Sequence, residues 1–243
     1  MELRNVLKTL VILPTYNERD NIRIVVDQIL ALELGVHVLI VDDDSPDGTG
    51  ALADELSQQH PDVSVMHRMT DRGRGRAGKA GFRYALDKGY DYIIEMDADL
   101  SHHPAQIPDL LAAAQDCDVV IGSRHVGAGR ESGRGLVRRL ITHFASRYMR
   151  FMLGVANVHD CTSGFRCFRR EALEAIDVDT LESVGPPIVT EVLSRCRGLR
   201  IEEIPIQFTD RVHGESKFGF RAIRDSLWIA LKIRLKRTPR AGR

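Results

Sequence analysis

The sequence predicts an α/β fold in which helices cover both faces of a mostly parallel sheet. Three observations support this: short apolar runs alternate with helical patterns, the runs are continuous, and polar clusters follow them directly. Continuous apolar runs are expected of strands that helices bury on both sides. With 243 residues, 43% of them hydrophobic and 28% charged, the chain can bury a substantial core, which excludes a disordered protein.

The first half of the chain alternates regularly between the two kinds of element. Strands are expected at residues 10–13, 36–41, 63–66, 92–96 and 119–121. Helices are expected between them, at residues 22–32, 51–59, 80–88 and 107–114. Such an alternation is typical of right-handed βαβ units.

The second half is less regular. Residues 127–135 are rich in glycine and arginine and predict a mobile loop, which could act as a lid. The remaining expected elements are a helix at 136–153, a hairpin-like region at 165–168, a helix at 189–196, a strand at 201–208 and an amphipathic basic segment at 221–237. Since no linker marks a boundary, we expect one domain over residues 1–243.

The formal net charge of zero is the sum of two unlike halves. Residues 1–122 carry 11 basic and 21 acidic side chains, and residues 123–243 carry 23 basic and 13 acidic ones. This asymmetry suggests a site that handles both a metal cation and anionic groups. The cysteines form no C-x-x-C pair and are expected to be buried free thiols in a reducing compartment; they are Cys117, Cys161, Cys167 and Cys196.

Polar clusters follow four of the predicted strands, at residues 15–18, 42–45, 97–99 and 122–124. In an open α/β sheet ligands bind beyond the carboxyl ends of the strands, so the clusters predict one shared site. Asp97 and Asp99 would supply oxygen ligands to Mg²⁺ or Mn²⁺, although an isolated pair of this kind could also form a turn or cap a helix.

The segment Asp42 to Thr49 contains further carboxylates beside a turn sequence. Asp42 and Asp43 end a predicted strand and are placed to reach a ligand, whereas Asp44 and Asp47 are expected in the turn. His102 and His103 have no third ligand at a usable spacing, so we interpret them as loop residues rather than a zinc site.

Residues 73–80 match a dinucleotide-binding glycine pattern and nearly match a phosphate loop. The first match is weak because residues 67–72 separate it from the preceding strand, and the second fails because Ala80 has no hydroxyl group. A flexible basic loop leading into a helix is the favoured interpretation.

Five segments taken in order resemble family 2 inverting glycosyltransferases, and among them the dolichyl- and polyprenyl-phosphate mannosyltransferases. They are PTYNE at 14–18, DDDSPDGT at 42–49, MDADLSHHP at 96–104, GSR at 122–124 and DRVHGESK at 210–217. The resemblance implies a nucleotide-diphospho-sugar transferase fold of the GT-A type. It also implies transfer of mannose from GDP-mannose to dolichyl or polyprenyl phosphate, with inversion.

The resemblance also implies roles for individual residues. The implied donor-binding residues are Pro14, Tyr16, Glu18, Val41, Asp43, Asp97, Ala98, Asp99, Arg124, Arg211 and Lys217. The implied ligands of Mg²⁺ or Mn²⁺ are Asp97, Asp99 and Ser101. The acceptor phosphate would meet Arg124, Arg138 or Arg139, and Thr142, and the residues of the transfer step itself would be Asp99 and Arg124. Residues 10–123 would form a donor half, 124–220 an acceptor half and 221–243 a basic tail.

Three positions depart from the family pattern. Asp44 stands where glycine is usual, Ser101 stands where some members have a metal-binding glutamine, and the basic stretch 73–78 replaces an apolar G-L-G-x-A. These departures affect the turn geometry, the metal ligands and the lining of the donor pocket. They remove no residue implied in the chemistry.

The basic tail predicts a contact with a membrane surface. Ile223, Leu227, Ala230 and Leu231 fall on one helical face with basic residues around it, as in an interfacial helix, although a core-packing helix fits equally. We expect a cytoplasmic protein held at the cytosolic membrane face directly or through a small anchoring partner, and no nucleic-acid partner.

Other functions remain open at this point. The same chemistry could use another donor, such as UDP-glucose, on polyprenyl phosphate. The near-match to a phosphate loop would instead indicate a kinase or nucleotidyltransferase. A nonenzymatic subunit that keeps the fold is a third possibility.

Overall fold

The computed structural model describes residues 7–132, 144, 147–155, 157–209 and 220–235. Within these residues one seven-stranded sheet has the order β3-β2-β1-β4-β7-β5-β8. Its strands are β1 (Thr9–Thr15), β2 (His37–Asp42), β3 (Val63–His67), β4 (Tyr92–Glu95), β5 (Val119–Ser123), β7 (Arg166–Arg169) and β8 (Ile201–Pro205). All neighbouring pairs are parallel except the two that involve β7, which confirms the predicted mostly parallel sheet.

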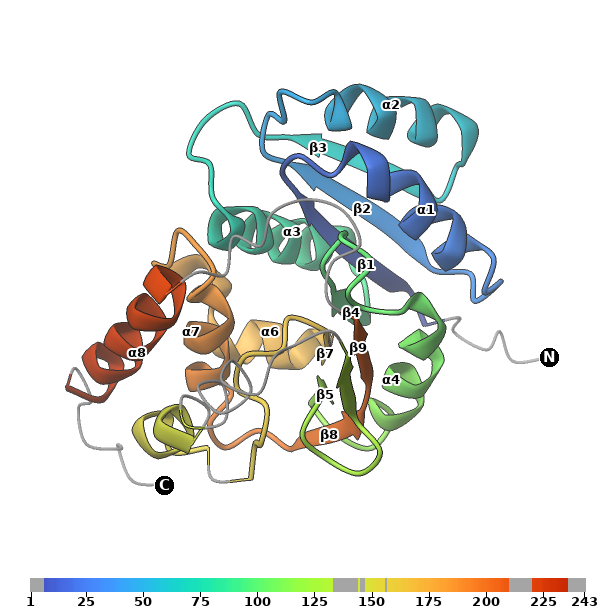
Figure 1. Ribbon diagram of the computed structural model, residues 1–243. Helices are drawn as coiled ribbons and strands as arrows, with labels where there is room; N and C mark the ends of the chain where they lie inside the picture. Colours follow the sequence, from blue (N-terminus) through green and yellow to red (C-terminus); the bar gives the residue numbers. More distant parts are fainter. Residues whose placement is uncertain (1–6, 133–143, 145–146, 156, 210–219, 236–243) are drawn as a thin grey trace.

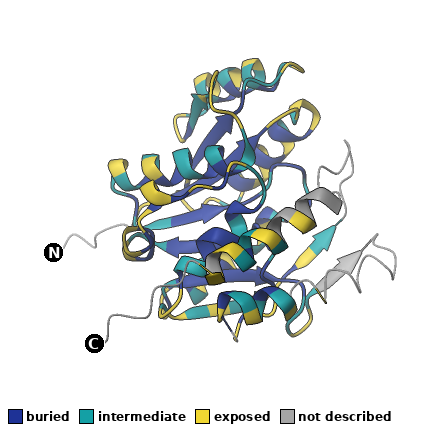
Figure 2. Ribbon diagram, turned by 90° about the vertical axis from the view of Figure 1, so that its left-hand side faces the viewer, coloured by how far each residue is buried: buried dark blue, intermediate teal, exposed yellow. Residues whose placement is uncertain are grey.

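Helices cover both faces of this sheet, as predicted (Figure 1). One face carries α1 (Arg19–Leu30), α2 (Thr49–Gln59) and α4 (Ile107–Ala113). The other carries α3 (Arg74–Lys88), α6 (Arg170–Ile176), α7 (Ile188–Arg195) and α8 (Phe220–Leu235). Figure 2 shows the strands buried between these two layers.

The helices form because their apolar residues recur on one side. In α1 the buried residues Ile22, Val25, Val26 and Ile29 follow the spacing of an amphipathic helix. In β1 successive side chains enter opposite layers, since Val11 and Leu13 pack under α1 and Ile12 packs under α3. The continuous apolar strands of the sequence are therefore explained by burial on both faces.

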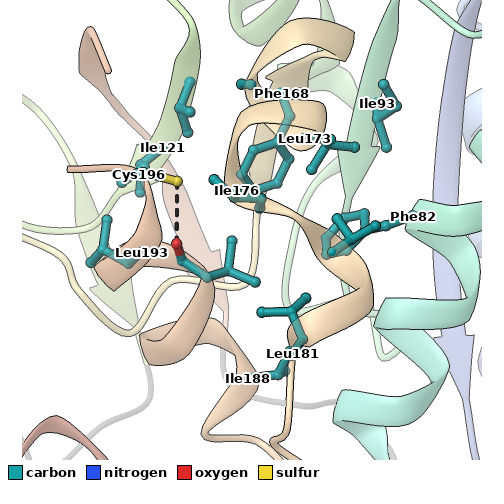
Figure 3. Packing of buried hydrophobic residues seen from close by; sticks show 14 of the residues in the cluster. Phe82, Ile93, Ile121, Phe168, Leu173, Ile176, Leu181, Ile188, Leu193 and Cys196 are labelled. Carbon is teal, nitrogen blue, oxygen red and sulfur yellow. Dashed lines mark hydrogen bonds between the residues drawn. The ribbon is translucent and has the colours of Figure 1, made fainter. Parts of the chain in front are cut away.

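The layer around α6 and α7 contains closely packed aromatic and aliphatic side chains (Figure 3). The rings of Phe82 and Phe168 meet edge to face, with centroids 5.5 Å apart. Cys196 lies in the same layer and its thiol donates to the carbonyl of Val192 at 3.3 Å. All four cysteines are free and buried, as predicted, and burial raises the pKa of the Cys196 thiol to about 12.

Helix α3 begins at Arg74, so the prediction of a flexible loop over residues 73–80 is wrong. Its glycines allow close approach to other elements. A Cβ atom on Gly75 would lie 2.2 Å from the carbonyl oxygen of Ser183, and one on Gly81 would lie 2.6 Å from Ile12. The glycine pattern therefore serves helix packing, and this is why it mimics a nucleotide-binding sequence.

Strand β7 lies between β4 and β5 and is antiparallel to both. The predicted hairpin-like region at 165–168 is therefore wrong: this segment pairs with two strands that are distant in the sequence. Helix α6, which follows β7 directly, was not predicted.

The predicted strand at 201–208 divides in two. Strand β8 ends at Pro205, which has no backbone N–H to continue the ladder, and β9 (Gln207–Thr209) joins a second small sheet. Its partner there is β6 (Arg130–Ser132), so part of the loop predicted at 127–135 is a strand.

Helix α8 corresponds to the predicted basic segment, but its predicted membrane face is partly a core face. Ala230 is fully buried, and Leu227 packs against the same layer as α7. The core-packing alternative is therefore correct for these two residues.

We predict that Gly81→Ala destabilises the protein by about 1–3 kcal/mol, because the added methyl group would overlap a branched side chain in a buried strand. Urea unfolding measures this loss. Gly185→Ala is the matched control, because its Cβ atom would lie 3.7 Å from its nearest neighbour, an ordinary contact. Equal stability of the two variants would contradict the close approach of α3 to β1.

Candidate active site

The four polar clusters of the sequence lie at one edge of the sheet. Strands β1, β2, β4 and β5 all point the same way, because β4 and β5 are each antiparallel to β7. The segment before β7, residues 160–165, reaches the same edge. The fold thus brings the predicted donor and acceptor halves together there.

The loops after β1 and β2 are tied to each other by side chains. The Asn17 N–H donates to Ser45 Oγ at 3.0 Å, and the Glu18 N–H donates to Thr49 Oγ1 at 2.9 Å. Asp42 is buried and accepts from the Ser45 N–H at 3.1 Å and from Thr15 Oγ1 at 3.2 Å. Asp42 therefore holds the loops together, contrary to the prediction that it reaches a ligand.

The turn after β2 has the geometry expected of its residues. Asp44 has a φ of 54°, in the left-handed region that favours glycine, which explains why it replaces a glycine of the family pattern. Asp47 accepts from the N–H groups of Thr49 and Arg19 at 2.9 and 3.1 Å. Burial alone would raise the pKa of Asp47, but hydrogen bonds from Thr49 and Arg19 lower it.

The implied nucleoside residues surround these loops. Pro14 and Val41 are neighbours in the β1–β2 register, and both are buried. Tyr16 is exposed beyond β1. Asp43 is buried, pairs with Arg68 and accepts from the Gly73 N–H at 2.6 Å. The Asp43 carboxylate therefore links the β2 loop to the start of α3.

Asp97 and Asp99 follow β4 and differ in their surroundings. Asp99 is buried and accepts hydrogen bonds from the N–H, at 3.0 Å, and the hydroxyl of Ser101. The side chain of Asp97 is 34% exposed and its Oδ1 lies 3.2 Å from Arg74. Ser101, predicted as a metal ligand, thus has its hydroxyl directed at Asp99.

Arg74 is a site residue that sequence reasoning missed. It begins α3, and its guanidinium bridges Asp97 and the buried carboxylate of Glu95, which lies at 2.7 Å. Burial opposes the charge of Arg74, but Glu95 and Asp97 outweigh it and raise the pKa of the guanidinium. The only sequence signal was the basic stretch that departs from the apolar family pattern.

Arg124 is buried in a bidentate ion pair with Asp160. Its Nε and a terminal nitrogen lie 2.7 and 2.8 Å from the two carboxylate oxygens, and it donates to Thr162 Oγ1 at 2.6 Å. Burial would raise the pKa of Asp160, but the charge and hydrogen bonds of Arg124 hold it well below its usual range. Asp160 is the second site residue that the sequence did not reveal.

Aromatic rings connect Arg124 to the Asp97 segment. The Arg124 guanidinium lies 5.1 Å from the centre of the Phe208 ring, and Phe208 meets the ring of His102 edge to face. His102 stacks on Phe165 and accepts a hydrogen bond from the Asp97 N–H at 3.1 Å. Burial lowers the pKa of His102, so this ring is a neutral support for the site.

The residues at this edge suit a hard divalent cation in part. Within the described residues, no group of three or more His, Cys, Asp or Glu side chains could hold a metal. Two carboxylates are present, and Gly164 leaves space beside one of them: a Cβ atom there would lie 3.4 and 3.6 Å from the Asp97 oxygens. The site thus fits a cation that shares its coordination sphere with a phosphate ligand.

Five predicted site residues lie outside the described part of the chain: Arg138, Arg139, Thr142, Arg211 and Lys217. Their roles stay predictions.

Comparison with known proteins gives close relatives. Residues 10–177 match the model of glycosyl transferase family 2. Polyprenol monophosphomannose synthase of Mycolicibacterium smegmatis is 44% identical over 93% of this chain and 86% of its own length. Undecaprenyl-phosphate mannosyltransferase of Micrococcus luteus is also 44% identical, over 88% of each chain.

Solved structures share the fold at low sequence identity. Glucosyl-3-phosphoglycerate synthase of Mycobacterium tuberculosis, in complex with phosphoglyceric acid, has a TM-score of 0.71 at 21% identity, over 97% of this chain and 82% of that one. Mannosyltransferase PcManGT of Pyrobaculum calidifontis, in complex with GDP-Man and Mn²⁺, has a TM-score of 0.61 at 18% identity, over 97% and 66%. These matches confirm the GT-A-like fold.

We predict that Asp160→Asn destabilises the protein by about 3–5 kcal/mol at neutral pH, because it leaves the charge of Arg124 buried without a counter-ion. The pKa of Asp160 is depressed in the folded state, so its stabilisation is present above the unfolded pKa of about 3.9 and is lost as the pH falls toward the lower native value. The difference between the two proteins in urea unfolding should therefore shrink below about pH 4.

Asp179→Asn is the control for this measurement. Asp179 pairs with Arg83 at 2.6 Å, but both side chains are exposed, so its loss should cost less than about 1 kcal/mol. Similar small losses for both variants at neutral pH would contradict the buried role of Asp160.

Proposed function

This chain belongs to glycosyl transferase family 2, among the polyprenyl-phosphate mannosyltransferases, and from that premise we propose that it transfers mannose from GDP-mannose to a dolichyl or polyprenyl phosphate. The observation that carries the proposal is the position of Asp97 and Asp99. They lie at the edge of the sheet between the nucleoside-side loops and the Arg124–Asp160 pair. A donor diphosphate at this edge would meet both sides.

The donor assignment rests on the relatives and on the loops after β1 and β2. The two 44% identical relatives are named for mannose transfer to polyprenyl phosphates, and the PcManGT structure holds GDP-Man. Pro14, Val41 and Asp43 form adjoining surfaces at the strand ends, where the resemblance puts the guanosine.

Asp97 and Asp99 would hold a divalent cation, Mg²⁺ or Mn²⁺, against the donor diphosphate. When bound, such a cation neutralises the charge that develops on the departing diphosphate. Asp99 is fixed for this by Ser101, and the Asp97 backbone is fixed by His102. Arg124, held by Asp160, would face the phosphate groups with its direction already set.

A phosphate acceptor simplifies the rest of the reaction. Its second pKa, of about 6, leaves it largely dianionic at neutral pH, so the oxygen that attacks needs no general base. Attack on the face of the sugar opposite the departing diphosphate inverts the anomeric centre in one step. The main task of the chain is then to hold two anionic groups close together, which arginine side chains do well.

A different donor on the same acceptor, such as UDP-glucose, is the nearest alternative. Donor competition separates the two: GDP should displace bound GDP-mannose at much lower concentration than UDP. The reverse order would assign a uridine donor.

The kinase or nucleotidyltransferase alternative loses its basis in the fold. Lys79 would have to reach a phosphate, but its ammonium donates to the carbonyls of Asp179 and Leu181 at 2.6 and 3.1 Å. The space beside Gly75 is taken by the Ser183 carbonyl. A nonenzymatic role is opposed by Asp97, Asp99 and Arg124, which keep the residue types that transfer requires.

We further propose that the enzyme contacts the cytosolic membrane face through a stripe on α8. Within the described residues, no helix is long and apolar enough to cross a membrane. Arg224, Trp228, Lys232 and Leu235 recur at helical spacing and are all exposed, with Trp228 at 64% and Leu235 at 77%. Large apolar side chains between cations suit an anionic lipid surface.

The end of this stripe adjoins a second exposed aromatic residue. Arg234 stacks over the Phe151 ring at 4.8 Å and donates to the Phe151 carbonyl at 3.1 Å. Phe151 itself is exposed. The apolar contact area thus extends from α8 to the helix at residues 147–153.

We predict that the purified protein transfers labelled mannose from GDP-mannose to polyprenyl phosphate with Mg²⁺ present, as measured after lipid extraction. Asp99→Ala should lower the rate by about two to three orders of magnitude, because it removes charge stabilisation from the departing diphosphate. Asp109→Ala, on α4, is the control and should stay active. Near-normal transfer by Asp99→Ala would overturn the assignment.

We predict that anionic vesicles shift the fluorescence of Trp228, the single tryptophan of the chain, to shorter wavelength, and that zwitterionic vesicles do not. Lys232→Glu should weaken the shift, and salt should reverse it. Met69→Ser removes an equally exposed apolar side chain elsewhere and is the control in vesicle sedimentation. Binding only in the presence of a membrane protein would instead indicate an anchoring partner.

A further inference from the structure

Arg74 holds a positive charge against the Asp97 carboxylate within the site itself. One terminal nitrogen lies 3.2 Å from Asp97 Oδ1 and the other lies 2.7 Å from Glu95 Oε1. The same guanidinium therefore has one buried anionic partner and one that faces the edge of the sheet. Among family resemblances this position is apolar, so the charge distinguishes this chain.

The position of Arg74 is set by close packing of the helix start. The Gly75 N–H donates to the Val184 carbonyl at 2.8 Å, and the Gly73 N–H is held by Asp43. A Cβ atom on Gly78 would lie 2.7 Å from Glu95 Oε1, so the first turns of α3 lie directly on the end of β4. The backbone of Arg74 is thus fixed at both sides of the residue.

Glu95 fixes the other end of the side chain. It is buried on β4, and its carboxylate would be costly there without a cation. The ion pair with Arg74 removes that cost and directs the guanidinium at Asp97. Arg74 cannot swing away from Asp97 without leaving Glu95 buried and unpaired.

We propose that Arg74 is a resident counter-ion of Asp97, with which a divalent cation has to compete, and that it sets a low intrinsic metal affinity of the free enzyme. The proposal rests on the proposed function in so far as Asp97 is a metal ligand. Two cations beside one carboxylate repel each other, so metal binding to the free site is weakened. The donor diphosphate, which brings negative charge, would relieve this repulsion, so metal and donor bind best together.

The test is Mn²⁺ binding without donor or acceptor, measured by titration calorimetry and by the electron paramagnetic resonance of free Mn²⁺. Arg74→Gln should tighten binding by about tenfold or more, because the competing charge is gone. Arg76→Gln is the matched control: it removes the same charge from the same helix, but Arg76 pairs with Asp71 at 3.4 Å and not with Asp97.

A second variant guards against misfolding and against the extra negative charge of an unpaired Glu95. Arg74→Gln combined with Glu95→Gln removes both charges of the buried pair, yet still withdraws the guanidinium from Asp97 Oδ1. Its Mn²⁺ binding should also be tighter than that of the wild type, by a smaller factor.

The proposal is overturned if neither variant binds Mn²⁺ more tightly, or if Arg76→Gln tightens binding as much as Arg74→Gln. Mannose transfer is measured separately on the wild-type enzyme. Absence of transfer with the expected Mn²⁺ shifts would refute only the proposed function, whereas transfer with unchanged Mn²⁺ binding would refute only the role of Arg74.

Discussion

The antiparallel strand β7 is the constraint on which the site depends. It enters the sheet between β4 and β5, with Arg166 opposite Glu95 on one side and Ile121 on the other. Its direction brings the preceding residues, 160–165, back to the edge where β4 and β5 end. Without this insertion Asp160 could not pair with Arg124, and Gly164 could not lie beside Asp97.

The charge asymmetry of the sequence has a more local meaning in the fold. Three carboxylates at the site, Asp43, Asp44 and Asp97, pair with arginines of the same acidic half, at positions 68, 72 and 74. Arg124 of the basic half pairs with Asp160 of that half. Charges are therefore balanced within each half before any ligand binds, and the difference in net charge does not by itself separate cation and anion sites.

Much of the fold could be predicted because its strands are buried on both faces, which leaves continuous apolar runs such as residues 38–41 in the sequence. The site edge followed from the polar residues at the strand ends. Features that depend on distant contacts could not be predicted. Arg74 finds Glu95 only after α3 packs on β4, and β7 has just four residues with partners far away in the chain. The glycines of α3 misled because close packing and phosphate binding favour the same residue.

The pairing of Arg124 with Asp160 also bears on how the site would act on phosphates. A guanidinium that is already neutralised attracts an anion less strongly than an isolated one, so it contributes little to simple affinity. Its direction, however, is fixed by the carboxylate, by Thr162 and by the Phe208 ring. A group fixed in advance needs no reorganisation when charge moves from the sugar bond to the diphosphate. The site is therefore suited to stabilising the transferring state more than to holding its substrates tightly.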